Sequence, residues 1–141
     1  MGYPELKLSN QICFLVYRLE HEIIARYKPL LQEIGLTYPQ YLVMLLLWEQ
    51  DGRPVGELCA ALGLDTGTVS PLLKRLEAAG CLRRAREGGD DRNVTIRLTD
   101  AGRALEERAR SIPGNLASCL DLDTRQYAEF HGTLAGMLAK L

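Results

Sequence analysis

The amino-acid sequence predicts a mainly α-helical fold that carries one small β-hairpin. Apolar residues recur at steps of three and four over most of the chain, which is the period of an amphipathic helix. Only residues 81–102 change to the alternation of a strand, on both sides of the turn-forming letters "EGGDD". No repeat, linker or low-complexity tract interrupts the 141 residues, so a single domain is expected over residues 1–141.

The first predicted helix covers residues 9–34. Ser9 is its expected N-cap, and Gly35 is expected to end it. Pro29 lies inside this helix and is expected to bend or break it, because proline lacks the backbone N–H of a helical residue.

The second predicted helix covers residues 37–52, with Thr37 as its N-cap and Gly52 as its stop signal. It is apolar nearly all round from Tyr41 to Trp48. We therefore expect this helix at the buried centre of the fold.

Residues 54–80 predict two short helices that are joined by a tight turn. The first covers about residues 55–61, Gly63 makes the turn, and the second covers about residues 67–79. The second helix has small polar groups near its beginning and basic groups further on, while its leucines would anchor it in the core. Its candidate DNA-binding residues are Thr66, Thr68, Ser70, Lys74 and Arg75.

The letters "LRRAR" (82–86) and "NVTIRLT" (93–99) predict the two strands of a basic hairpin directly after these helices. Residues 74–97 have a net charge of +3, between segments of −3 (1–73) and −1 (98–141). Concentrated positive charge is what phosphate binding requires, although an ordinary solvated basic face would look the same. The whole arrangement is that of a winged helix-turn-helix, and the candidate DNA-binding residues of its wing include Arg84 and Arg86.

The remaining residues predict two further helices. One is capped by Thr99 in "LTDAGRALEERARSI" and is interrupted at Pro113 and Gly114, and the last covers about residues 123–140. Cys119 lies between them in a polar, glycine-containing stretch, which is expected to move more easily than a packed helix.

The cysteines and histidines do not suggest a metal site. The four cysteines form no CxxC pair, and the two histidines are far apart in the sequence, so neither a metal nor a cofactor is predicted. The N-terminus has no signal-peptide pattern, and no apolar run approaches the roughly 20 residues that span a bilayer. We therefore expect a cytoplasmic protein with no membrane partner and with free thiols, and we expect Cys59 and Cys81 to be core residues.

Several of these segments resemble a known family. The letters "LDTGTVSPLLKRLEAAGCLRR", "DDR" (90–92) and "LTDAG" (98–102) resemble the MarR family of winged-helix repressors. Within that family, "NQICF" (10–14) and "LTYPQYLVMLLLWE" (36–49) resemble the organic hydroperoxide resistance regulators. The resemblance covers roughly residues 5–140 and implies a DNA-binding transcriptional repressor rather than an enzyme.

The resemblance also implies an assembly. It implies a homodimer in which helices from about residues 1–36 and 100–141 of both chains interleave. The DNA-binding part would cover about residues 37–99 and would bind a palindromic double-stranded operator. Organic hydroperoxides would act as the inducers that release the DNA.

Site residues follow from the same motifs. By resemblance, Cys13 of "NQICF" is the redox sensor, and Tyr27 and Tyr38 would hydrogen-bond its thiolate. Arg92 would be the minor-groove arginine of the wing, positioned by Asp90. The chain resembles the two-cysteine members of the subgroup, which implies that oxidised Cys13 forms a disulfide with Cys119 of the other chain.

The position of Cys13 agrees with this role. It follows the expected Ser9 cap by four residues, so it lies near a helix N-terminus, whose partial positive charge favours a thiolate. Tyr17 follows one turn later and is a further candidate to stabilise the thiolate. In a continuous helix Tyr27 would lie about 21 Å further along the axis, so it could reach the thiol only from the partner chain.

Other readings remain open. A lone cysteine in an apolar helix is more often a core residue than a sensor. A repressor of this family could also be released by a small phenolic or other ligand, with Cys13 structural, and a small-molecule thiol could cap Cys13 in place of Cys119. A thiol peroxidase using Cys13 and Cys119 is a third class, although no motif for peroxide activation is seen.

Overall fold

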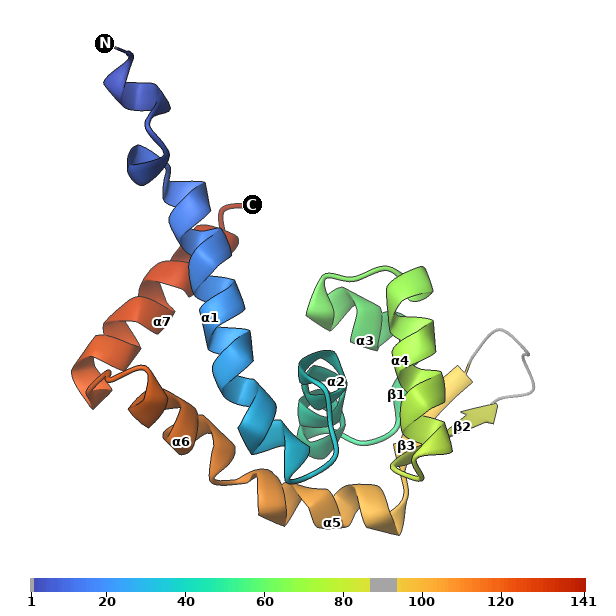
Figure 1. Ribbon diagram of the computed structural model, residues 1–141. Coiled ribbons are helices and arrows are strands. Elements are labelled where there is room, and N and C mark those ends of the chain that lie inside the picture. The colour runs from blue at the N-terminus through green and yellow to red at the C-terminus, as the bar shows by residue number, and fades with distance from the viewer. Residues whose placement is uncertain (1, 87–93) are drawn as a thin grey trace. The chain divides into compact units, whose positions relative to one another are not determined.

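The computed structural model describes residues 2–86 and 94–141 (Figure 1). These residues form two compact units, which are described separately below. One unit consists of residues 31–110, and the other combines residues 1–30 with residues 111–141. The sequence suggested a DNA-binding part of about residues 37–99, between dimerisation parts of about residues 1–36 and 100–141. In the structure the helix that follows residue 99 belongs to the unit of residues 31–110, which is called the central unit below.

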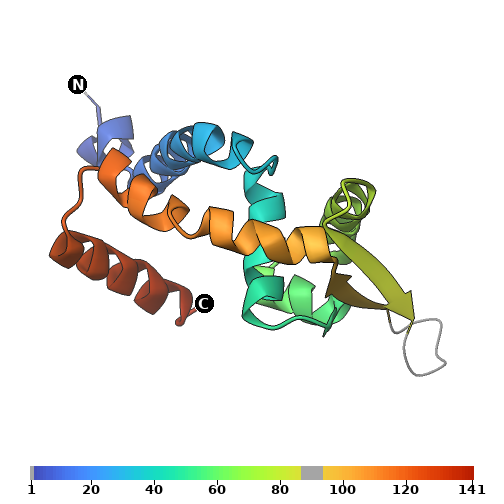
Figure 2. The same ribbon diagram turned by 90° about the horizontal axis from the view of Figure 1, so that it is seen from below.

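Residues 31–110 form a winged helix-turn-helix, as predicted. Three strands pair antiparallel in the order β1-β3-β2, and α4 packs on β2 and on α3 (Figures 1 and 2). The elements are α2 (Tyr38–Glu49), β1 (Arg53–Pro54), α3 (Val55–Leu62), α4 (Thr66–Ala78), β2 (Leu82–Arg86), β3 (Val94–Leu98) and α5 (Asp100–Ala109).

Helix α2 occupies the centre of this unit, as its apolar composition predicted. Its N-terminus carries a complete capping box, in which Gln40 N–H donates to Thr37 Oγ1 and Thr37 N–H donates to Gln40 Oε1. The fully buried core around it draws on the end of α1 and on α2, α3, α4, β2 and β3. Its largest members are Leu31, Met44, Leu47, Leu58, Leu73, Leu76, Leu82 and Ile96.

The sheet departs from the predicted alternation at two points. Strand β1 was not predicted, and it pairs Arg53 with Ile96 and Pro54 with Thr95. Thr95 lies opposite Pro54 of this added strand and is buried at 7% exposure, although its position in the alternation predicted an exposed side chain. Among the described residues, Thr95 included, no buried side-chain nitrogen or oxygen lacks a hydrogen-bond partner.

A close backbone approach joins the beginning of α5 to the beginning of β2. A Cβ atom added to Gly102 would lie 2.0 Å from the Cys81 carbonyl oxygen. Around this contact, Trp48 Nε1 donates to the Gly102 carbonyl at 2.9 Å, and Thr99 N–H donates to the Cys81 carbonyl at 3.1 Å. Thr99 also caps α5 as predicted, since its Oγ1 accepts from Gly102 N–H at 3.0 Å. Only glycine fits at this contact.

Asp51 connects three further parts of the same unit. Its Oδ1 accepts hydrogen bonds from the amides of Gly52 (2.8 Å) and Leu98 (2.9 Å), and its Oδ2 pairs with Arg103 at 3.2 Å. Burial opposes ionisation, but these hydrogen bonds outweigh it and lower the pKa of the Asp51 carboxyl below its ordinary 3.8. An ionised Asp51 thus holds the end of α2, strand β3 and helix α5 together.

The other unit begins differently from the prediction. Two 3₁₀ turns, Pro4–Leu6 and Leu8–Asn10, precede helix α1 (Ile12–Gln32). The expected N-cap Ser9 was therefore wrong, because it lies within the second 3₁₀ turn. Of the bend or break expected at Pro29, the break was wrong, because α1 continues through this residue. The helix ends at Gln32, shortly before the Gly35 that was expected to end it, and Gly35 adopts a left-handed conformation (φ 72°).

The segment expected to be an irregular connection is also helical. It forms α6 (Ile112–Cys119), which tolerates Pro113 because a proline in the first turn removes no intrahelical hydrogen bond. Asp121 follows in the left-handed region with φ 54°, and α7 (Thr124–Leu138) then begins at the Asp123 cap. The prediction of the last helix is confirmed, and that of a non-helical connection at Cys119 is wrong.

Apolar side chains lie exposed along the terminal elements of this unit. They come from the 3₁₀ turns, from the first half of α1 and from α7. The members are Tyr3, Leu6, Leu8, Ile12, Leu15, Val16, Tyr17, Leu19, Tyr127, Leu134, Met137 and Leu138. Within the described residues no helix has the length and apolar character needed to cross a membrane, and no cluster of three or more His, Cys, Asp or Glu side chains is placed to hold a metal ion.

We predict that Gly102→Ala destabilises the protein by about 2 kcal/mol or more, because the new methyl group overlaps the Cys81 carbonyl. Urea unfolding followed by circular dichroism measures this loss. The matched control is Gly56→Ala in α3, where nothing lies within 4 Å of the added Cβ. That variant should be neutral or slightly more stable, and equal effects of the two substitutions would contradict the close approach.

We also predict that Asp51→Asn flattens the acid dependence of stability. The pKa of Asp51 is lowered in the folded protein, so the unfolded chain binds more protons below about pH 4 and the parent loses stability as the pH falls. The variant lacks this contribution, which is at most about 1.4 kcal/mol per pH unit. Urea unfolding between about pH 2 and 6 measures it. Parallel profiles for Asp51→Asn and the parent would contradict the role of the Asp51 carboxylate.

Candidate functional site

The candidate DNA-binding helix α4 begins at a well-formed turn. Gly63 ends α3 in a left-handed conformation (φ 66°), and Asp65 Oδ1 caps α4 by accepting from Thr68 N–H at 2.8 Å. Hydrogen bonds from the Thr68 side chain and amide lower the pKa of Asp65, which keeps this cap ionised. Thr66 and Thr68 are exposed at the beginning of α4, and Ser70 is half-buried. Two of the three small polar side chains that were predicted to contact DNA are therefore exposed.

Exposed cations follow on the same helix and on β2. Lys74 and Arg75 are exposed, and neither has an ion pair among the described residues. Arg83 on β2 has the same properties, and the sequence reasoning missed it. The register could have indicated it, because alternation along "LRRAR" places Arg83 on the opposite face of β2 from Arg84 and Arg86.

Two predicted wing cations lie in different environments. Arg84 pairs with Glu77 through both Nε (3.2 Å) and Nη2 (3.1 Å). Arg86 is exposed at the end of β2 and makes interactions of its own. The predicted residues Asp90 and Arg92 lie outside the described residues.

The letters "NQ" before the candidate sensor have a structural role. Asn10 Nδ2 donates to the Pro4 carbonyl at 2.7 Å, and Gln11 Nε2 donates to the carbonyls of Glu5 (2.8 Å) and Lys7 (2.9 Å). These bonds hold the 3₁₀ turns and end them directly before Ile12. Cys13 is therefore the second residue of α1, closer to the helix N-terminus than predicted, and its side chain is exposed.

The three tyrosines that were predicted to stabilise the Cys13 thiolate lie at different places in the structure. Tyr17 is one turn beyond Cys13 on α1, is 61% exposed, and has its ring 4.4 Å from that of His21. Tyr27 is half-buried on the same unbroken helix, about 21 Å further along its axis, so it does not meet Cys13 of its own chain. Tyr38 is the first residue of α2 in the other unit, with its ring 6.4 Å from that of Tyr41.

The three other cysteines differ in their exposure to solvent. The thiols of all four cysteines are free. Cys119 is exposed at the last position of α6. Cys81 is buried as predicted, and burial raises the pKa of its thiol, which makes it unreactive. Cys59 is only half-buried, with its Sγ 4.0 Å from Thr66 Oγ1, so the prediction of a core position was wrong for this residue.

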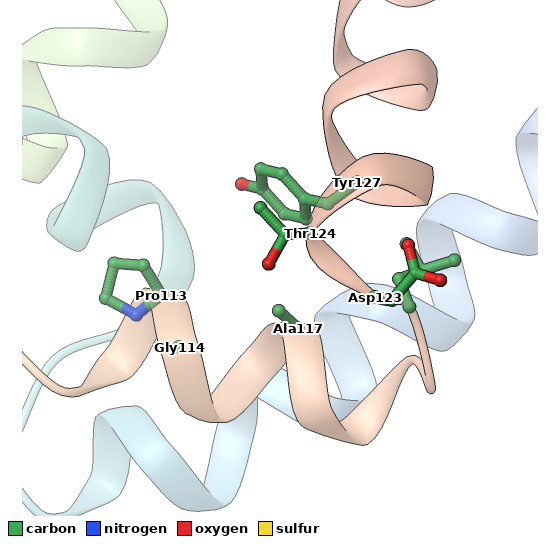
Figure 3. A pocket seen from close by; sticks show the side chains of 7 residues that line it. Pro113, Gly114, Ala117, Asp123, Thr124 and Tyr127 are labelled. Atoms are coloured by element: carbon green, nitrogen blue, oxygen red, sulfur yellow. The ribbon is translucent and has the colours of Figure 1, made fainter.

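A pocket of about 300 Å³ lies between α6 and α7 (Figure 3). In Figure 3 the side chains of Thr124 and Tyr127 project from α7 toward Pro113 and Ala117 of α6. The lining is mainly apolar, and Asp123 contributes a carboxylate whose Oδ1 is occupied by the Gln126 amide at 2.8 Å. Its size is at the lower end of that of small-molecule sites.

Comparison with known proteins identifies relatives of the whole chain. Residues 25–108 match a family model described as transcriptional regulator SarA/Rot. The organic hydroperoxide resistance transcriptional regulator of Bacillus subtilis (strain 168) is 46% identical over 114 residues, which cover 81% of this chain and 78% of that protein. The HTH-type transcriptional regulator TtmR of Methylorubrum extorquens (strain PA1) is 43% identical over 134 residues, 95% of this chain and 69% of that protein.

Solved structures give the same result. AbfR of Staphylococcus epidermidis, in its reduced form bound to DNA, has a TM-score of 0.82 and 32% identity, covering 99% of this chain and 96% of that chain. The disulfide form of AbfR has a TM-score of 0.66 and 34% identity, covering 96% of this chain and 90% of that chain. These relatives are regulators and not enzymes. The chain therefore belongs to the MarR/SarA-type family of winged-helix, DNA-binding transcriptional regulators.

Proposed function

We propose that the chain is a cytoplasmic, homodimeric repressor that releases its operator when an organic hydroperoxide oxidises Cys13. The observation that carries this proposal is the exposed thiol at the second residue of α1. It directly follows Asn10 and Gln11, whose side chains donate hydrogen bonds to the preceding turns. A thiolate there lies next to the unpaired N–H groups of the first helical turn, which favour negative charge.

The chemistry requires only the thiol and the peroxide. The Cys13 thiolate attacks one oxygen of the O–O bond, and the alkoxide leaves as an alcohol after it takes up a proton. The sulfur is thereby oxidised to a sulfenic acid and the peroxide is reduced. The relatives favour this chemistry: one is a regulator of organic hydroperoxide resistance, and AbfR exists in reduced and disulfide forms.

Helix α4 and the wing would bind the DNA. The exposed Thr66 and Thr68 lie at the N-terminal end of α4, which is the end that a recognition helix presents to base edges, and Ser70 follows half a turn later. Lys74, Arg75 and Arg86 would contact phosphates, with Arg92 in the minor groove and Asp90 beside it. A palindromic operator fits two such heads related by a two-fold axis.

Exposed apolar side chains support the dimer. A monomer with this many uncovered side chains on its 3₁₀ turns, α1 and α7 would expose an unusually large apolar surface in water. Many of the structural relatives are dimers. In a dimer, Tyr27 and Tyr38 of the partner could donate hydrogen bonds to the thiolate, while Tyr17 of the same chain lies one turn away.

Cys119 would resolve the sulfenic acid. Its thiol would displace water from the Cys13 sulfenic acid of the other chain and form a disulfide, which needs Cα atoms within about 7 Å. Because α6 is helical up to Cys119, the movement would have to begin in the turn after it, where Asp121 already adopts a left-handed conformation. Capping of Cys13 by a small-molecule thiol is the alternative.

A second candidate function follows from the pocket between α6 and α7. Its apolar lining and the Tyr127 side chain suit a small aromatic compound, and such a ligand would make the protein a ligand-responsive repressor with a structural Cys13. Binding of this kind would release DNA without any change of the thiol.

We predict that Cys13→Ser binds the protein's own upstream DNA but stays bound when organic hydroperoxide is added. A gel-shift assay with and without cumene hydroperoxide measures this, and Cys59→Ser serves as the matched control that should release DNA like the parent. Release of Cys13→Ser by the peroxide would contradict a sensor at this position. Release of the parent by a phenolic compound but not by peroxide would favour the pocket.

We further predict that stoichiometric peroxide converts the parent into a covalent dimer on non-reducing electrophoresis. The dimer should be absent in Cys13→Ser and in Cys119→Ser, because each variant lacks one sulfur of the bridge. Intact-mass analysis checks the alternative. A monomeric parent with a mass gain on Cys13 alone would show that Cys119 does not resolve the sulfenic acid.

A further inference from the structure

Glu77, near the end of α4, holds the guanidinium of Arg84 on β2 in a two-pronged contact. Glu77 Oε1 accepts from Arg84 Nε at 3.2 Å and from Nη2 at 3.1 Å. Glu77 Oε2 accepts from the Arg84 backbone amide at 2.9 Å. Both carboxylate oxygens are thus fixed by one residue, a geometry stronger and more specific than that of a single surface contact.

The pair lies on the face of the sheet that packs on α4. Arg84 is directly opposite Ile96 in the register, and Ile96 is fully buried. Residues directly opposite in an antiparallel pair point to the same face, so Arg84 lies on the side of β2 that faces the candidate DNA-binding helix. Both side chains keep about a third of their surface exposed (38% for Arg84 and 35% for Glu77), so solvent and DNA can reach them.

Three other cations of α4 and β2 differ from Arg84 in their ion pairing. Lys74, Arg75 and Arg83 are exposed and have no ion pair among the residues that the structure describes. Hydrogen bonds from the Arg84 amide and side chain lower the pKa of Glu77, so its carboxylate remains charged at neutral pH. The Glu77–Arg84 pair therefore has no net charge beside three uncompensated cations.

We propose that Glu77 is a built-in counter-ion that keeps Arg84 from contacting DNA phosphates and so limits the sequence-independent part of DNA affinity. The proposal rests on the DNA-binding function proposed above, and it replaces the direct DNA contact that the sequence suggested for Arg84. Glu77 is a positioning residue: it acts through Arg84 and through the base of the wing, not by touching DNA.

Salt dependence separates this role from a merely structural one. Each cation that neutralises a phosphate releases counter-ions and adds about 0.9 to the steepness with which log affinity falls against log salt. If Glu77 occupies Arg84, Glu77→Gln should add about one contact. Between about 50 and 200 mM salt, its affinity relative to the parent should then fall about threefold to fourfold. The affinity for DNA of unrelated sequence should rise, and the ratio of specific to non-specific binding should decrease.

The experiment measures fluorescence anisotropy of reduced protein with two duplexes, one of the protein's own upstream DNA and one of scrambled sequence. The variants are Glu77→Gln, Glu77→Gln combined with Arg84→Gln, and Glu57→Gln. Glu57→Gln is the matched control, because it removes one exposed acidic charge from α3 in the same unit and has no arginine partner among the described residues. The glutamine at 77 keeps an oxygen that can accept from the Arg84 amide, so β2 should stay in place.

We expect a steeper salt dependence for Glu77→Gln alone, a return to the parental slope when Arg84→Gln is added, and the parental slope for Glu57→Gln. A parental slope for Glu77→Gln, with or without loss of operator affinity, would overturn the proposal. So would a steeper slope that persists in the double variant or that Glu57→Gln shares. A parent that does not bind duplex DNA in a salt-dependent way would overturn the proposed function as well, which distinguishes the two failures.

Discussion

The contact of Gly102 with the Cys81 carbonyl is the constraint on which the central unit depends. With no side chain at this position, the first turn of α5 can lie directly on the turn that joins α4 to β2. Trp48 then reaches the Gly102 carbonyl from α2, and Thr99 bonds both to Cys81 and to its own helix. The family motif "LTDAG" is therefore a packing motif: its threonine and glycine fix the geometry that presents α4 and the wing.

Some charged side chains of the central unit form ion pairs that stabilise the fold, and others remain free to contact DNA phosphates. Asp51 pairs with Arg103, and Glu77 pairs with Arg84, so two acidic residues each stabilise a junction and neutralise a cation. Among the residues that the structure describes, Lys74, Arg75 and Arg83 are exposed cations without an ion pair. For this reason the net charge of −1 says little about DNA binding, and the pairing of each cation says more.

The sequence predicted those elements whose signals are local. The N-caps Thr37 and Thr99 stand next to the helices that they begin, so the beginnings of both helices were predicted correctly. Strand β1 was missed because it exists only through its pairing with β3, about 40 residues further along the chain, a contact that local pattern does not encode. Tyr27 and Tyr38 were named through family resemblance alone. Tyr27 lies about 21 Å from Cys13 along the same helix, so it could meet a Cys13 thiol only across two chains.

The beginning of α1 shows why a correct motif can still be placed on a wrong element. Ser9 is a good capping residue by type, but the amides of Asn10 and Gln11 bond to carbonyls behind them and stabilise 3₁₀ turns in place of a helical turn. The helix consequently begins at Ile12, and Cys13 lies among the N–H groups that have no intrahelical partner. The same hydrogen bonds that delay the helix thus place Cys13 in its first turn. The order of residues in "NQICF" therefore has a physical reason: the two side-chain amides set where the first turn begins, and the cysteine occupies that turn.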